Sequence, residues 1–211
     1  MNNITLISTV HEEIGKCNSD QLCEIIEKIG PEVIFLEAPE NSYSEYDKMR
    51  YTSFGVLHKK LELSAIQKYS IKTSFDYVPV LDKGLSDSFE KKYDIVCEKK
   101  ELQNLIDNFN SLAAEHGFKF LNSTESIKLH EEMRMLESRI LNESEIDKMA
   151  NEYIDAYENS MLRNIYSYCK TNKFNKAIFM CGVAHRISII KKIEEYKAQE
   201  EIDLSWTIFG E

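Results

Sequence analysis

Glycine and proline are scarce in this chain, which has 7 Gly and 3 Pro among its 211 residues. Both residues mark the turns of chains that change direction often. Their scarcity argues against a chain with many tight turns and favours long regular elements, mostly helices. Since 43% of the residues are hydrophobic and 29% are charged, the composition is that of an ordinary globular protein. We expect a single domain over residues 1–211.

Paired cysteines are absent as well. The cysteines are odd in number and scattered, and no two of them form a CxxC pair: Cys17, Cys23, Cys97, Cys169 and Cys181. This pattern excludes a disulfide framework and a zinc ribbon, and it favours a reducing compartment.

Long apolar runs and an excess of positive charge are also missing. The first apolar run ends at His11 and has no basic stretch before it, so it predicts neither a signal peptide nor a membrane span. The formal net charge of −10 disfavours nucleic acid and anionic membranes as partners. We therefore expect a cytoplasmic protein whose partners include neither nucleic acid nor a membrane.

Short apolar runs alternate with helical patterns at both ends of the chain. Asn18 and Gln21 have capping-box spacing at the start of a helix that Gly30 and Pro31 end. Pro79 suggests that its strand lies at a sheet edge or ends there. The expected strands lie near residues 3–8, 33–36, 74–80, 176–181 and 203–209, and the expected helices over 18–29, 51–69 and 187–198.

From about residue 85 to 170 the pattern is almost wholly helical. The chain thus predicts an α/β fold with a mainly parallel sheet of about 4–5 strands and flanking helices. The large helical insertion, roughly 85–170, should cover the carboxyl ends of the strands.

Four polar residues follow predicted strands. They are His11, Glu37, Asp82 and His185, although Asp76 competes with Asp82 for the third strand. Ligands of open parallel sheets bind outside the carboxyl ends of the strands, so we expect these side chains to meet there. The segment Ala177–Arg186 is the clearest case, because an apolar run is broken by Gly182 and followed by His185 at the start of a helix.

Two kinds of chemistry are open to such a set. Two imidazoles and a carboxylate can hold a catalytic metal that turns a bound water into hydroxide. Without a metal, His11 or His185 could act as a general base oriented by Glu37. The helix that begins near His185 favours its neutral imidazole, which both roles need.

Each of these residues also has a simpler interpretation, without a role in a functional site. A single His after a strand is commonly an exposed turn residue, and Arg186 could hold an anion or simply face solvent. Glu12, Glu13 and Glu40 could support the ligands or form a solvated acidic rim, and Tyr43, Tyr46 and Tyr51 could line a pocket or a common loop. The remaining candidates favour structural interpretations: His58 and His116 in helices or at their ends without partners at ligand spacing, His130 on a charged helix face, Cys181 as an inert buried thiol, and Tyr153, Tyr157 and Met161 as packing residues.

Three motifs resemble the TraB/TIKI/erythromycin-esterase-like superfamily, which includes ChaN-like proteins. They are Ile7-Ser-Thr-Val-His11, Pro31-Glu-Val-Ile-Phe-Leu-Glu37 and Cys181-Gly-Val-Ala-His185, in the order and at the approximate distances of the family's GxxH, PDxVxxE and second GxxH motifs. The chain departs from the family at Ser8, which replaces Gly, and at Tyr157, which replaces an Arg. Arg163, on the same predicted helix, could take over the role of that Arg.

The resemblance implies an α/β fold with a site built from His11, Glu37 and His185. Branches of the superfamily are metal-dependent peptidases, esterases or haem- and iron-associated proteins. We therefore expect a hydrolase of peptide or ester bonds that activates water at this site, with a divalent metal such as Mn, Co or Zn held by the three residues. Arg163 or Arg186 would stabilise the anion that forms. The alternative is a non-catalytic protein that binds a metal, haem or a small ligand, or a regulatory protein of the same superfamily.

Overall fold

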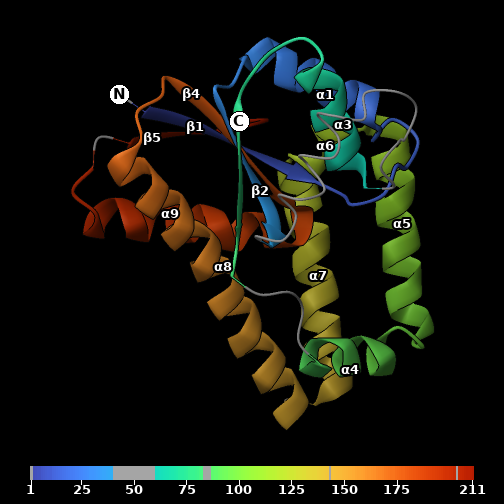
Figure 1. The fold of residues 1–211 in the computed structure, drawn as a ribbon. Helices are drawn as coiled ribbons and strands as arrows, with labels where there is room; N and C mark the ends of the chain where they lie inside the picture. The colour runs from blue at the N-terminus through green and yellow to red at the C-terminus, as the bar shows by residue number, and fades with distance from the viewer. Residues whose placement is uncertain (1, 40–59, 83–86, 143, 203) are drawn as a thin grey trace.

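The computed structural model describes residues 2–39, 60–82, 87–142, 144–202 and 204–211. In these residues five strands form one sheet, and every pair of neighbouring strands is parallel (Figure 1). The order across the sheet is β3-β2-β4-β1-β5. The strands are β1 (Asn2–Thr9), β2 (Val33–Pro39), β3 (Asp76–Leu81), β4 (Lys176–Gly182) and β5 (Leu204–Ile208). The predicted α/β class with a parallel sheet is confirmed.

Helices fill the connections between the strands. They are α1 (Ser19–Ile29), α3 (Leu61–Ser70), α4 (Asp87–Val96), α5 (Lys100–His116), α6 (Phe118–Leu121), α7 (Thr124–Leu141), α8 (Glu145–Thr171), the short 3-10 turn η2 (Val183–His185) and α9 (Arg186–Gln199). The predicted cap of α1 is confirmed, because the Asn18 side chain accepts a hydrogen bond from the Gln21 N–H at 2.9 Å. Gly30 ends the helix with a φ of 64°, a conformation that glycine adopts without strain.

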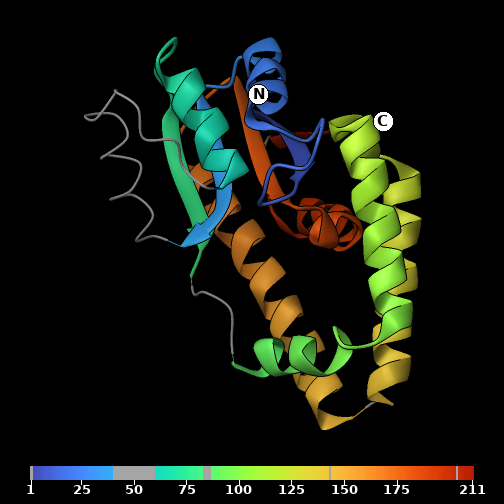
Figure 2. The same cartoon turned by 90° about the vertical axis from the view of Figure 1, so that its right-hand side faces the viewer.

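The two faces of the sheet bury different helices, because side chains alternate along each strand. On one face, Ile34 and Ile178 pack in the core that also contains residues of α1, α3, α5, α6 and α7. On the other face, Phe35 and Phe179 pack with residues of α8 and α9. Figure 2 shows the sheet between these two layers. Both faces are covered, as expected of a parallel sheet.

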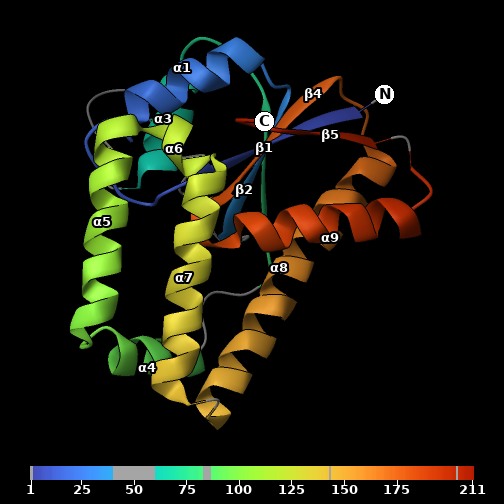
Figure 3. The same ribbon diagram turned by 180° about the vertical axis from the view of Figure 1, so that it is seen from behind.

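The helical block predicted for 85–170 has two parts. Toward the carboxyl ends of the strands, α5 and α7 run side by side, and α4 contacts both α7 and α8 at the far end (Figure 3). The second half of α8 instead packs on the sheet, where Met161 and Ile165 are fully buried. The block therefore covers the strand ends and also supplies part of one sheet layer.

Three details differ from the sequence prediction or sharpen it. Glu37 lies within β2 instead of just after it. Pro79 lies inside β3. A proline is tolerated there because β3 is an edge strand of the sheet. β1 and β2, the first two strands of the chain, are parallel but are separated by β4. Among the described residues, no helix has the length and apolar character needed to cross a membrane.

Candidate active site

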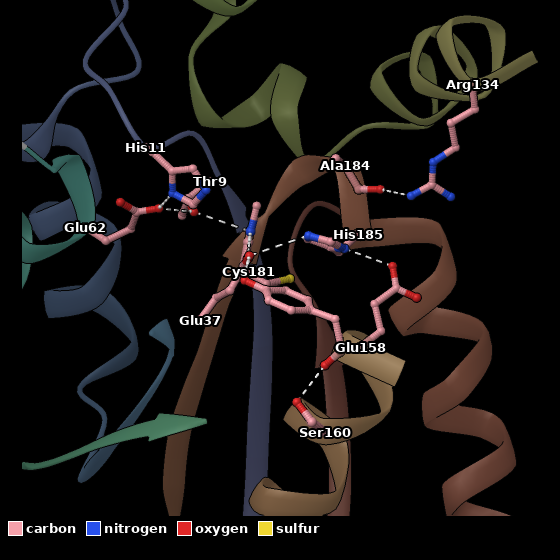
Figure 4. A network of polar contacts seen from close by, with 12 residues as sticks. Thr9, His11, Glu37, Glu62, Arg134, Glu158, Ser160, Cys181, Ala184 and His185 are labelled. Atoms are coloured by element: carbon pink, nitrogen blue, oxygen red, sulfur yellow. Dashed lines mark hydrogen bonds and ion pairs between the residues drawn. The ribbon is translucent and has the colours of Figure 1, made fainter. Parts of the chain in front are cut away.

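Three neighbouring strands bring His11, Glu37 and His185 together. In the register of β2, β4 and β1, Leu36 lies opposite Met180, and Thr9 lies opposite Gly182. A methyl carbon placed on Gly182 would lie 3.4 Å from Glu37 Oε2, 3.6 Å from His11 Nε2 and 3.7 Å from His185 Cδ2. The three side chains therefore surround one point, and the small residue at 182 leaves the space between them open (Figure 4).

His11 is held by a buried glutamate. Its Nδ1 lies 3.1 Å from Glu62 Oε1, and the same oxygen accepts a hydrogen bond from the Thr9 hydroxyl at 2.7 Å. The Leu61 N–H also donates to the His11 carbonyl, which ties α3 to this loop. The hydrogen bond with Glu62 raises the pKa of His11 against the opposing effect of burial. His11 Nε2 is left facing the point beside Gly182.

His185 is held by glutamates at both ring nitrogens. Nδ1 lies 2.9 Å from Glu158 Oε1, and Nε2 lies 3.5 Å from Glu37 Oε1. Burial by itself would lower the pKa of His185, but the contacts with Glu158 and Glu37 outweigh it and raise the pKa to about 9. The expectation of a neutral imidazole is therefore wrong, because two carboxylates act on the ring more strongly than the helix that begins beside it.

Glu37 is an ionised carboxylate with three close donors. Its Oε2 accepts a hydrogen bond from the Gly182 N–H at 2.5 Å, and its Oε1 accepts one from the Tyr157 hydroxyl at 2.8 Å. Burial would raise the pKa of Glu37, but His185, the Gly182 N–H and His11 lower it to about 2. Tyr157 also stacks on the His185 ring, with 5.4 Å between ring centroids. Tyr157, which the sequence favoured as a packing residue, thus contacts two of the three site residues.

Glu158 is the second support of His185. It is 1% exposed, and its Oε2 accepts a hydrogen bond from the Ser188 hydroxyl on α9. Its neighbour on α8, Tyr157, contacts Glu37. One turn of α8 therefore positions both His185 and Glu37.

Three predicted site residues do not join this group. Asp82 and Arg163 form an ion pair with each other at the edge of the sheet, and neither lines the cavity described below. They lie apart because β3 is the edge strand, on the far side of β2 from β4. Asp76 lies at the opposite end of β3 and accepts a hydrogen bond from Tyr168.

Arg186 is buried below the site and does not face it. The side chain is 1% exposed, and its guanidinium donates to Ser8, to Asn122 and to the carbonyl of Phe209. Both sequence interpretations, an anion-binding group and a solvent-exposed residue, are wrong. Arg186 joins β1, the loop after α6 and the chain beyond β5, which is a structural role.

The remaining candidates fall into three groups. Glu12 is exposed, and Glu13 accepts hydrogen bonds from Ser19. Cys181 is 1% exposed and burial raises the pKa of its thiol, as expected of an inert core residue. Some candidates lie outside the described residues: Glu40, Tyr43, Tyr46, Tyr51 and His58.

A cavity of about 910 Å³ opens above the three side chains. Its floor contains His11, Glu37 and His185, and its walls come from α4, α5, α7 and α8. His130 lies on the α7 wall, with its Nε2 atom buried, so its assignment to a charged helix face is wrong. The predicted helical cover of the strand ends thus encloses a space large enough for a small-molecule or peptide ligand.

The donor types at this site suit a divalent metal, but their arrangement does not. Two imidazoles and one carboxylate are common ligands, and each imidazole has a carboxylate at Nδ1, as metal-binding histidines often do. However, His185 turns its Cδ2 edge toward the shared point and its Nε2 toward Glu37. Within the part of the chain that the structure describes, no three His, Cys, Asp or Glu side chains form a group that could hold a metal ion.

Sequence reasoning missed Glu62, Glu158 and Arg134. Glu62 lies between buried leucines on α3, and no periodicity sets it apart from a solvated helix residue. Glu158 follows Tyr157 in the segment compared with the family's Arg motif, which was the one available signal. Arg134 donates a hydrogen bond from α7 to the Ala184 carbonyl, a contact that only the tertiary structure creates (Figure 4).

Comparisons of the chain with models of protein families, with curated proteins and with solved structures give no match. The resemblance to the TraB/TIKI/erythromycin-esterase-like superfamily therefore rests on the three motifs alone. What the structure adds is that those motifs meet at the carboxyl ends of β1, β2 and β4.

Proposed function

We propose that this protein is a hydrolase of ester or peptide bonds in which His11 takes a proton from the attacking water. One observation carries the proposal: two imidazoles, each held at Nδ1 by a buried glutamate, flank Glu37 around one point in the floor of a cavity. An imidazole fixed by a carboxylate, with its other nitrogen open to a cavity, is a common form of general base.

His11 is the base in this proposal. Its Nε2 would accept a proton from water while the water oxygen forms a bond to the carbonyl carbon of the substrate. The adjacent Glu62 carboxylate, 3.1 Å from Nδ1, would stabilise the imidazolium that results. The proton would then pass to the leaving oxygen or nitrogen as the bond to the carbonyl carbon breaks.

His185 supplies positive charge in this proposal. Because both of its nitrogens face carboxylates and its pKa is about 9, it would be an imidazolium at neutral pH. Its charge would stabilise the negative charge that develops on the carbonyl oxygen. Glu37, with a pKa of about 2, is a weak base. We assign it to positioning, since it binds His185, Tyr157 and the Gly182 N–H at once.

A metal-dependent form is the second version of this proposal. His11, Glu37 and His185 would hold the divalent ion, Mn, Co or Zn, which would supply an activated water. It requires His185 to lose a proton and to turn Nε2 away from Glu37, because an imidazolium has no free lone pair. Assays after EDTA treatment, with and without each ion, separate the versions. Activity that persists in EDTA supports the first, and activity that only an added ion restores supports the second.

A non-catalytic binding protein is the alternative from another class. Tyr157 favours it, because this residue stands where the resemblance places an Arg. The ligand would be a metal, haem or a small molecule in the same cavity. Binding of haem in an absorbance titration, together with no turnover of any ester or peptide, would support this alternative against the hydrolase.

The decisive experiment is an activity screen with a matched pair of variants. Purified protein is assayed on 4-nitrophenyl esters of increasing chain length and on a fluorogenic peptide library. His11→Ala should lower kcat/KM about 10²- to 10⁴-fold, the usual contribution of a general base. His116→Ala is the control, since His116 is exposed at the end of α5 and does not line the cavity. Hydrolysis that survives His11→Ala unchanged would overturn the proposal.

A further inference from the structure

The α7 wall of the cavity carries two polar side chains that the proposed reaction does not use. His130 and Arg134 are four residues apart on α7, so they lie on the same side of the helix, and both line the cavity. Figure 4 shows the Arg134 side chain reaching from α7 toward the turn that carries His185. Both residues therefore line the same cavity as the reaction centre, and Arg134 lies beside the turn that follows β4.

Arg134 is fixed next to the site by a backbone contact. Its Nη2 donates to the carbonyl of Ala184, the residue before His185. In the described part of the chain, no carboxylate pairs with Arg134. By contrast, Lys92, another cation that lines the cavity, lies 3.0 Å from Glu137 and 3.5 Å from Asp147.

The carboxylates that line the cavity are held by other groups. Glu158 is hydrogen-bonded to His185 and Ser188, and Asp155 pairs with Lys192 on α9. The remaining donors of the Arg134 guanidinium have no hydrogen bond to the described residues. A guanidinium is a planar fork of donors that matches the two oxygens of a carboxylate or phosphate. Arg134 is therefore a partly exposed cation that no carboxylate of the described residues neutralises.

His130 adds a buried nitrogen without a partner. Among the described residues no group bonds to its Nε2, although less than 1 Å² of that atom is exposed. The ring packs against Phe109 with 4.6 Å between centroids, which fixes its orientation. Burial, together with the charges of Arg134 and His185, lowers the pKa of His130 to about 4, so the imidazole is neutral. The neutral ring therefore adds no second charge to this wall, and Nε2 is too little exposed for a ligand in the cavity to bond to it.

The surrounding wall is apolar. Ile106 and Phe109 on α5, Met133 on α7 and Ile154 on α8 also line the cavity. A ligand whose anionic group bound Arg134 would place its remaining atoms against these side chains. The wall thus matches a molecule with one anionic end and an apolar body.

We propose that Arg134, beside the neutral ring of His130, forms a binding subsite for an anionic oxygen group, a carboxylate or a phosphate, on a substrate that also has an apolar portion. The inference rests on the proposed function in one respect: the ligand is a substrate only if the protein is a hydrolase. The subsite itself is defined by binding and can be tested without turnover. It would place the scissile bond of an acidic ester or amide over His11 while Arg134 holds the anion.

Calorimetric titration with three related probes tests the subsite. The probes are 3-phenylpropionate, phenyl phosphate and the neutral 3-phenylpropanamide. We expect at least one anionic probe to bind the full-length protein about tenfold or more tightly than the amide, and the stronger of the two identifies carboxylate or phosphate as the preferred group. Equal binding of all three probes, or no binding of either anion, would overturn the proposal.

Variants on α7 make the test specific. Arg134→Gln should weaken binding of the anionic probe about 10- to 100-fold, the range expected for charge-assisted hydrogen bonds. Arg134→Lys, which keeps the charge, should lose less. His130→Phe, which keeps the packing on Phe109 and an uncharged wall, should bind the probe nearly as wild type does. Arg139→Gln is the matched control, because Arg139 is exposed on the same helix and does not line the cavity. Equal binding by Arg134→Gln and wild type would contradict the assignment.

The two proposals can fail separately. Anion binding that depends on Arg134 without any hydrolysis would reject the hydrolase and keep the subsite. Hydrolysis that depends on His11, but that neither Arg134→Gln nor the charge of the substrate changes, would keep the hydrolase and reject the subsite.

Discussion

The ends of β1 and β4 carry the same arrangement with different consequences. Each strand is followed by a histidine whose Nδ1 contacts a buried glutamate, Glu62 for His11 and Glu158 for His185. The His11 side chain is 55% exposed, and its Nε2 bonds to none of the described residues. The His185 side chain is 14% exposed and has a second carboxylate, Glu37, at Nε2. The additional carboxylate, Glu37, thus makes His185 a buried cation, whereas His11 is a candidate base.

The strongest test of this comparison is stability. His185→Gln leaves Glu37 and Glu158 buried without their cation, and breaking a buried ion pair in this way costs about 3–5 kcal/mol. His11→Ala removes a half-exposed partner and should change the free energy of unfolding by about 1 kcal/mol or less. Urea unfolding of the two variants measures both values. Equal losses of unfolding free energy in the two variants would show that the contacts of His185 and those of His11 contribute equally to stability, against this comparison.

The shared point beside Gly182 can be filled without disturbing the fold. Gly182 has φ −55° and ψ 138°, which any residue adopts, and a methyl carbon there would make contacts of 3.4 to 3.7 Å. Gly182→Ala should therefore leave the urea midpoint close to wild type. It should lower kcat/KM about 100-fold, because the methyl group takes the space where water would stand between the two histidines. Wild-type activity in this variant would place the reaction elsewhere.

Glu62, the glutamate that contacts His11, should strengthen His11 as a base. Glu62→Gln removes the negative charge that stabilises protonated His11 and should lower kcat about tenfold, part of the 10²- to 10⁴-fold usual for a general base. The substitution is nearly isosteric, so thermal unfolding should show a folded protein. Restoration of activity at higher pH would argue against this role, because loss of the carboxylate should lower the pKa of His11 and not raise it.

The smallest expected effect is on the alkaline side of the pH profile. The raised pKa of about 9 means that His185 keeps its proton below pH 9 and loses it as the pH rises further. About a quarter of the population is still protonated at pH 9.5, so kcat/KM should fall about fourfold between pH 8 and pH 9.5. Glu158→Gln should move this decline to lower pH, whereas Glu62→Gln should move only the acid side. A decline that Glu158→Gln leaves in place would contradict the role of His185.

Much of the fold could be predicted because its signals are local. The Asn18 cap, the stop at Gly30 and the apolar strands depend on residues close together in the sequence, and each is present. Pro79 correctly indicated an edge strand. The order of the strands could not be predicted, because the placement of β4 between β1 and β2 depends on pairing across more than 140 residues.

The candidate site could be predicted only in part. His11, Glu37 and His185 follow strands, and parallel strands bring their ends together. Arg186 and Asp82 also follow strands, yet the first turns into the core and the second lies at the edge. His130 and Arg134 come from α7, and the path of that helix over the strand ends leaves no signal in its periodicity. Sequence position therefore identified the floor of the cavity but not its walls.

The sequence by itself determined that an apolar strand would deliver a histidine at each end of the chain and a glutamate between them. Only the tertiary structure decided what those residues are chemically. Glu158 and Glu37 reach His185 from two other elements and raise its pKa to about 9, while Glu62 reaches His11 from a third. Protonation depends on charges a few ångströms away in space, and the spacing of residues along the chain does not encode those distances.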